Sequence, residues 1–258
     1  MLLALGTSTW LHAQRYADSE TLWRTTLSQN PDCWLADDNL GYELLRTGRL
    51  VEATDRIQEA LRLEPNDALA HNNLGSIMEK EGRDLEAHDQ FQRAVQLNPA
   101  YASAYNNLGN SLLKADRYSE AIQQFEKALA LKPDNTDIQY NFGLALQKAG
   151  RDSEAIQEYR GILILSPDDA GTHNNLGVLL QQSGQIAEAI TQFQAALNLE
   201  PNSVEVHNNL GIALSEAGQL TEALNQFQQA LRIDPADESA RQNLLRTQAA
   251  LESNSAKK

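Results

Sequence analysis

A short phrase, Asn-Asn-Leu-Gly, recurs through this chain at a fixed interval, and this recurrence constrains the fold more than any other feature. One copy is Asn72 to Gly75, and each further copy follows 34 residues after the last, as from Leu74 to Leu108. The close copies lie at 106–109, 174–177 and 208–211, and altered copies lie at 38–41 and 140–143. A period of this length indicates a stack of similar units, each burying its apolar face against its neighbours.

Two kinds of break divide each repeat in the same way. Proline stops a helix, and glycine readily forms a tight turn, so their shared register predicts helix, turn, helix in every unit, with no strand pattern. The prolines are Pro31, Pro65, Pro99, Pro133, Pro167, Pro201 and Pro235, and the mid-repeat breaks are Gly48, Gly82, Asp116, Gly150, Gly184 and Gly218. Residues able to cap a helix follow five of the prolines: Asp67, Asn135, Asp169, Ser203 and Asp237. Tyr101 is the exception in that column.

Small and aromatic residues also keep their places from repeat to repeat. In the third copy the first helix carries Leu108 and Gly109, and the second carries Ala121, Phe125 and Ala128. This pattern resembles the tetratricopeptide repeat: Leu-Gly in one helix, then Ala, an aromatic residue and Ala in the next, then Pro. The resemblance implies an all-α fold, a right-handed α-solenoid (superhelix) of antiparallel helix pairs.

The repeat pattern predicts a division of the chain into a degenerate N-terminal helix pair, six repeats, a capping helix and a disordered tail. The expected ranges are 1–33 for the N-terminal pair, 34–67, 68–101, 102–135, 136–169, 170–203 and 204–237 for the repeats, 238–252 for the cap and 253–258 for the tail. The fourth repeat departs most, because Phe142, Gly161 and Ile162 replace the usual Leu, a better helix former and Ala. We expect its packing to be locally altered.

Charge and composition exclude several classes of function. The formal net charge is −14, which disfavours non-specific binding to nucleic acid and to an anionic membrane surface. Cys33 is the only cysteine, so no internal disulfide is expected. Neither a phosphate-binding loop nor a catalytic grouping stands out, and histidines at one per repeat (His71, His173 and His207) do not converge as metal ligands would. We therefore expect no enzyme activity, no cofactor and no metal. The sequence does not determine the location, which is cytoplasmic by default and extracytoplasmic if the chain is part of a membrane protein.

The candidate binding residues lie on the side of each first helix that faces away from the core, which in tetratricopeptide proteins is a concave groove for peptides. The sixth residue of the first helix is asparagine in all six repeats: Asn39, Asn73, Asn107, Asn141, Asn175 and Asn209. An amide side chain both donates and accepts, so this column could hold the peptide bonds of an extended ligand. In this respect it resembles the asparagine ladder of O-linked N-acetylglucosamine transferases. The alternative is that the same side chains bond neighbouring helices to each other.

Two further groups share this side. A basic row, Lys80, Lys114 and Lys148 with Arg46 before them, predicts an anionic ligand segment, or else it compensates the helix dipole. The ninth place becomes apolar at Leu144, Val178 and Ile212, next to Tyr140 at a fifth place. These side chains could anchor an apolar or aromatic partner group, or they are ordinary exposed apolar residues.

The leading functional hypothesis is a protein–protein interaction scaffold that binds an extended peptide or partner protein. The alternative is a non-catalytic domain of a larger membrane-bound glycosyltransferase-like protein. It depends on the stretch from Tyr16 to Trp23, with Asn30-Pro31 and Trp34 to Ala36, which resembles the juxtamembrane junction of bacterial proteins related to O-mannosyltransferases. Met1 to Leu5 would then be the stub of a membrane helix; otherwise no membrane contact is expected.

Overall fold

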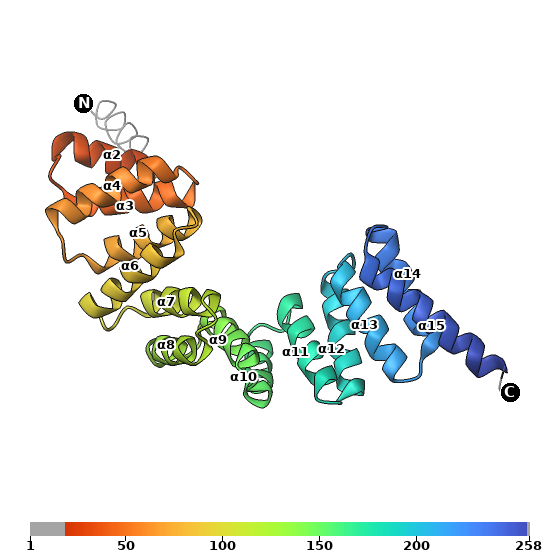
Figure 1. The fold of residues 1–258 in the computed structure, drawn as a ribbon. Coiled ribbons are helices and arrows are strands. Elements are labelled where there is room, and N and C mark those ends of the chain that lie inside the picture. The colour runs from red at the N-terminus through yellow and green to blue at the C-terminus, as the bar shows by residue number, and fades with distance from the viewer. Residues whose placement is uncertain (1–18, 257–258) are drawn as a thin grey trace, which may run out of the picture. The chain divides into compact units, whose positions relative to one another are not determined.

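The computed structural model describes residues 19–256, and all of its regular structure within that range is α-helical (Figure 1). The predicted first half of the N-terminal helix pair, including Met1 to Leu5, lies outside the described residues, as do residues 257–258 of the predicted tail. None of the described helices is both long and apolar enough to cross a membrane.

The helices form two compact units, and each is an α-solenoid segment of stacked antiparallel helix pairs. Residues through Pro133 belong to the first unit, and residues from Asp134 belong to the second. The first contains α2 (Ser19–Gln29), α3 (Trp34–Arg46), α4 (Leu50–Leu63), α5 (Ala68–Lys80), α6 (Asp84–Leu97), α7 (Ala102–Lys114) and α8 (Tyr118–Leu131). The second contains α9 (Thr136–Lys148), α10 (Asp152–Leu165), α11 (Ala170–Gln182), α12 (Ile186–Leu199), α13 (Val204–Glu216), α14 (Leu220–Ile233) and α15 (Glu238–Ala256).

The predicted caps and turns begin and end these helices. The Asp67 carboxylate accepts the backbone N–H of Leu69 at 2.9 Å, and the other four predicted caps likewise accept backbone N–H groups. Tyr101 makes no side-chain cap, as expected. The turn glycines have φ between 74° and 79°, and Asp116 takes the same left-handed conformation at φ 56°. Aspartate is one of the few other residues that adopt this conformation at low cost.

The core of five of the six repeats is a glycine packed against an aromatic ring. A Cβ added at Gly75 would lie 2.6 Å from Phe91, and one added at Gly109 would lie 2.7 Å from Phe125. These phenylalanines are fully buried, and Ile57 fills the same place in the first pair. The two helices can approach this closely only because the glycine has no side chain.

The fourth helix pair is altered locally, as expected from its sequence. Tyr159 takes the place of phenylalanine, and its buried hydroxyl has no hydrogen-bond partner. Gln139 on α9 donates to Glu158 on α10 at 3.0 Å. A Cβ on Gly161 would lie 2.7 Å from the Gln139 amide nitrogen, so the glycine inside α10 makes room for this hydrogen bond.

The last helix is longer than predicted. It continues to Ala256, so residues 253–256 are helical and the prediction of a disordered tail was wrong for them. No proline or glycine occurs after Glu238 to break the helix. Leu251 and Asn254 also line a small hollow beside the start of α14, so the end of the helix has a neighbour.

Candidate functional site

Within each unit, the first helices of successive repeats pack closer to each other than the second helices do, at every step except that from α9 to α11. Consecutive first helices pack against each other, α3 with α5 and α5 with α7, and likewise α11 with α13 and α13 with α15. No two consecutive second helices pack to the same extent in the described part of the chain. We call the inner face the surface formed by the fifth, sixth, ninth and thirteenth residues of the first helices, with the loops that precede these helices.

The asparagine column ties neighbouring repeats together. Five amide nitrogens, including that of Asn243, which continues the column on α15, donate to the fifth residue of the preceding first helix, as Asn107 Nδ2 does to Asn72 Oδ1 at 2.9 Å. The other such bonds are Asn73 to Asp38, Asn175 to the Tyr140 hydroxyl, Asn209 to Asn174 and Asn243 to Asn208, at 2.8–3.1 Å. Asn39 donates instead to the Leu35 carbonyl within its own helix. These donors hold the stack together, so a ligand N–H would meet the amide oxygens rather than the nitrogens.

The three histidines are accounted for by contacts within their own repeats. Nδ1 of His71 lies 2.7 Å from Gln90 Oε1, and Nε2 lies 3.2 Å from the Pro65 carbonyl oxygen. His173 and His207 make the same pair of contacts. Each histidine thus links its helix to the second helix and to the preceding loop. The described residues include no group of three His, Cys, Asp or Glu side chains that could hold a metal ion.

The basic row is partly neutralised by neighbouring carboxylates. Lys114 forms an ion pair with Glu79 of the preceding repeat at 2.5 Å, and Arg46 pairs with Glu43 at 3.0 Å. Lys80 and Lys148 are exposed and form no ion pair with any described residue. These two lysines therefore remain the cations of the row that a ligand would meet.

The apolar group lies beside a hollow in the second unit. Leu144, Val178 and Ile212 are partly exposed on the inner face. Tyr140 lines a hollow of about 280 Å³ between α9 and the start of α11, and its ring centroid is 5.9 Å from that of Tyr159. The remaining lining residues are Thr136, Asp137, Asn141, Asp169 and Gly171. Gly171 stands where other repeats carry a side chain, which keeps this space open.

A buried acidic pair in the first unit was not predicted. Asp38 on α3 is 2% exposed, and burial raises its pKa to about 6, with a further rise from Asp67. The pKa of Tyr101 is raised to about 12, mainly by burial and further by the negative charges of Asp38 and Asp67. The sequence held one signal: aspartate stands at a fifth place that is asparagine in four other repeats.

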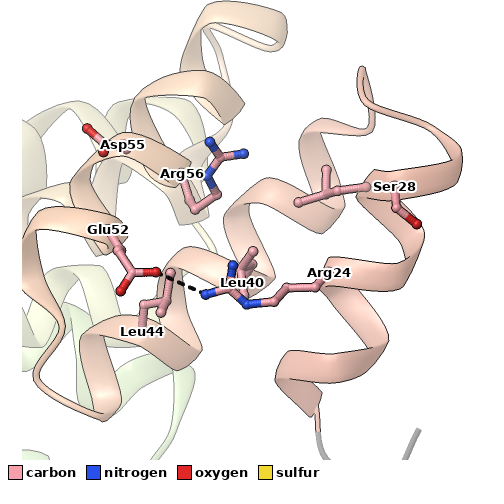
Figure 2. Close-up of a pocket in the computed structure, with 8 residues that line it drawn as sticks. Arg24, Ser28, Leu40, Leu44, Glu52, Asp55 and Arg56 are labelled. Atoms are coloured by element: carbon pink, nitrogen blue, oxygen red, sulfur yellow. Dashed lines mark hydrogen bonds and ion pairs between the residues drawn. The ribbon is translucent and has the colours of Figure 1, made fainter. Parts of the chain in front are cut away.

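A second feature that was not predicted is a cavity of about 390 Å³ between α2 and the pair α3–α4 (Figure 2). Leu40 and Leu44 form its apolar wall, and an ion pair of 3.0 Å joins Arg24 to Glu52 across it. Arg160 and Glu188 form the corresponding ion pair in the second unit, at 2.7 Å. The recurrence indicates that this ion pair links successive second helices rather than marking a ligand site.

Comparison with known proteins agrees with this architecture. Two sequence families described as tetratricopeptide repeat match the chain, one at residues 39–102 and 106–170 and the other at 168–236. No curated protein was found to match this sequence.

Solved structures of similar fold include YrrB, described as a TPR protein with an unusual peptide-binding site. It is 25% identical over 72% of this chain and 96% of its own, with a TM-score of 0.63. PilW, a type IV pilus biogenesis factor, is 22% identical over 82% of this chain and 98% of its own, with a TM-score of 0.73. PilF of Pseudomonas aeruginosa is 20% identical over 81% and 95%, with a TM-score of 0.72.

Proposed function

The chain belongs to the tetratricopeptide-repeat family, and from this premise we propose that it is a non-catalytic scaffold whose inner face binds an extended segment of a partner protein. Proteins of this family typically bind protein or peptide partners, and the similar YrrB has a peptide-binding site. The observation that carries the proposal for this chain is the hollow beside Tyr140.

That hollow suits a side chain of an extended ligand. It combines an aromatic ring with carboxylate groups, and it lies on the same inner face as Leu144, Val178 and Ile212. A few apolar or aromatic contacts in a partly enclosed site supply most of the affinity of a typical interface. We place the anchor of the ligand here.

The rest of the predicted surface would act as a less selective contact. In this proposal the amide oxygens of the asparagine column (Asn39, Asn73, Asn107, Asn141, Asn175 and Asn209) accept N–H groups of the ligand backbone. Lys80 and Lys148 meet its acidic groups, and Lys114 contributes only if it leaves Glu79. These roles differ because most of the amide nitrogens already donate hydrogen bonds within the stack, and because Lys114 is already paired with Glu79.

Selection from a library of random peptides displayed on phage tests the proposal. The affinity of selected peptides would be measured by fluorescence anisotropy for the parent chain, Tyr140→Ala and Val178→Ala. We expect each substitution to weaken binding at least about tenfold, because a side chain that fills a ligand contact contributes on the order of 1–2 kcal/mol.

The matched control is Ile164→Ala, on the second helix α10. Ile164 is 82% exposed, so its truncation changes apolar surface without touching the inner face. Selected peptides should bind this variant as they bind the parent. Failure to select any peptide, or equal loss in all three variants, would refute the proposed inner-face site.

A second candidate is the non-catalytic repeat domain of a membrane-bound, glycosyltransferase-like protein. The specific observation behind it is the resemblance of the stretch from Tyr16 to Trp23, with Trp34 to Ala36, to a juxtamembrane junction. Reading the DNA upstream of Met1 tests it. An open reading frame that encodes several hydrophobic spans upstream of Met1 supports this candidate. An in-frame stop codon followed by a ribosome-binding site just before Met1 excludes it.

A further inference from the structure

Two buried carboxylates in the first unit lack a cationic partner. Asp38 is 2% exposed and Asp67 is 7% exposed, and no described Lys, Arg or His forms an ion pair with either. The Asp67 Oδ1 atom caps α5 by accepting the Leu69 N–H, but its buried Oδ2 atom has no hydrogen-bond partner. The neighbouring Asp37 is just as buried, yet it is paired with Arg56 at 2.9 Å.

Both carboxylates lie where α3 packs against α5, because Asp38 on α3 accepts the Asn73 amide of α5 and Asp67 caps the start of α5. The charge of Asp67 reaches Asp38 and raises its pKa, and both carboxylates raise the pKa of Tyr101. The Tyr42 hydroxyl is close enough to Tyr101 to add to that rise. Asp38 and Tyr42 are one turn apart on the inner face of α3, and Tyr42 is 50% exposed. The group therefore joins a buried acidic end to an accessible aromatic end.

Packing between repeats does not require a charge at Asp38. It accepts a hydrogen bond from Asn73 at 2.9 Å, and Asn72, Asn174 and Asn208 accept the same bond from the following repeat elsewhere. A neutral amide thus performs the structural task. A buried, unpaired carboxylate costs several kcal/mol, a cost that a cation from outside the chain would offset.

We propose that Asp38 and Asp67 bind a cationic side chain, a lysine ammonium or an arginine guanidinium, of the partner segment. This inference rests on the proposed scaffold function and adds a charge requirement at one ligand position. Charge-assisted hydrogen bonds to the two carboxylates hold the cation, and the rings of Tyr42 and Tyr101 lie beside its aliphatic stem.

Small blocked amino acids test the site without any known partner. The probes are N-acetyl-arginine methylamide and N-acetyl-lysine methylamide, with the citrulline and norleucine analogues as neutral matches, titrated into the full chain by NMR. We expect one or both cationic probes to bind at least about tenfold more tightly than their matches, since the charge strengthens each hydrogen bond. The two cationic probes together show whether the site prefers the planar guanidinium or the ammonium.

Asp38→Asn and Asp67→Asn should each weaken the cationic probe at least about fivefold, because each removes one of its two anionic partners. Both variants keep an oxygen to accept the hydrogen bond from Asn73 or Leu69, and circular dichroism checks their helicity. Asp237→Asn is the matched control, an equivalent change at the partly exposed cap of α15. It should leave the affinity within about twofold of the parent, as distant surface changes usually do.

Equal binding of charged and neutral probes, or cationic binding that survives both substitutions, would overturn the site. The peptide library separates this result from the wider proposal. Selected peptides that lack Lys and Arg and ignore Asp38→Asn would leave the scaffold intact and overturn the cation site. A cation site that responds to both substitutions, in a chain that selects no peptide, would support the site and refute the scaffold.

Discussion

Replacing Asp38 by asparagine should stabilise the first unit, and the gain should depend on pH. The folded-state pKa is raised to about 6 from an ordinary value of 3.8, mainly by burial. The folded chain therefore binds this proton more tightly than the unfolded chain does. The resulting penalty is absent well below pH 4, grows between pH 4 and 6, and is complete above pH 6. A shift of about two pKa units corresponds to about 3 kcal/mol.

Urea unfolding of the parent chain and Asp38→Asn at pH 8 and pH 4 measures this difference. All three tryptophans lie in the first 34 residues of the sequence, and the two that the structure describes, Trp23 and Trp34, belong to the first unit, so tryptophan fluorescence follows the unfolding of that unit. We expect the variant to gain about 2–3 kcal/mol at pH 8 and about 0.5 kcal/mol at pH 4. The hydrogen bond from Asn73 is kept in both proteins, and its preference for the charged carboxylate is already included in the raised pKa of Asp38.

A gain of equal size at both pH values would contradict the reasoning, because the effect would then not come from the charge. A loss of stability at pH 8 would show that the carboxylate already has a compensating partner. Asp237→Asn, measured in the same way, controls for the general change in net charge.

Three further predictions follow from the repeat contacts. Asn107→Ala removes the hydrogen bond to Asn72 and should lower the free energy of unfolding by about 1 kcal/mol in urea titrations; no change would show that the bond contributes nothing. Gly109→Ala places a Cβ 2.7 Å from the Phe125 ring and should cost about 1–3 kcal/mol, whereas a cost near zero would mean that the pair relaxes freely. Lys80→Gln should reduce the salt dependence of binding to an acidic peptide selected from the phage library, because one ligand-facing charge is lost. Fluorescence anisotropy at several ionic strengths measures this, and an unchanged salt dependence would exclude Lys80 from the contact.

Local features of the fold were predictable because they depend on residues close together in the chain. The cap at Asp67 and the left-handed turn at Asp116 each follow from the chemistry of one residue and its immediate neighbours. The Gly109–Phe125 contact was predictable from periodicity, because the glycine keeps its place in all six copies and an aromatic residue keeps its place in five of them. The end of α15 was missed because no stop signal marks it in the sequence, and its neighbours at the start of α14 are known only from the fold.

The candidate site was predictable only as a set of places on one side of the first helices. The sequence left the role of Asn107 open, and the structure assigned its donor to Asn72 because their side chains meet across 35 residues. It likewise left Lys114 as a candidate cation, and the structure paired it with Glu79. Such choices depend on which side chains of successive repeats come within hydrogen-bonding distance.

The sequence by itself thus determined the repeat length, the helix pairs and the residues that pack between them, because a periodic pattern of small, apolar and helix-breaking residues leaves one way to bury the apolar faces. Only the tertiary structure decided which polar groups are already satisfied and which are not. Asp38 and Asp67 are 29 residues apart and gave no joint signal, yet stacking buries them together without a cation. Burial and pairing arise from the stacked helices and not from any one repeat.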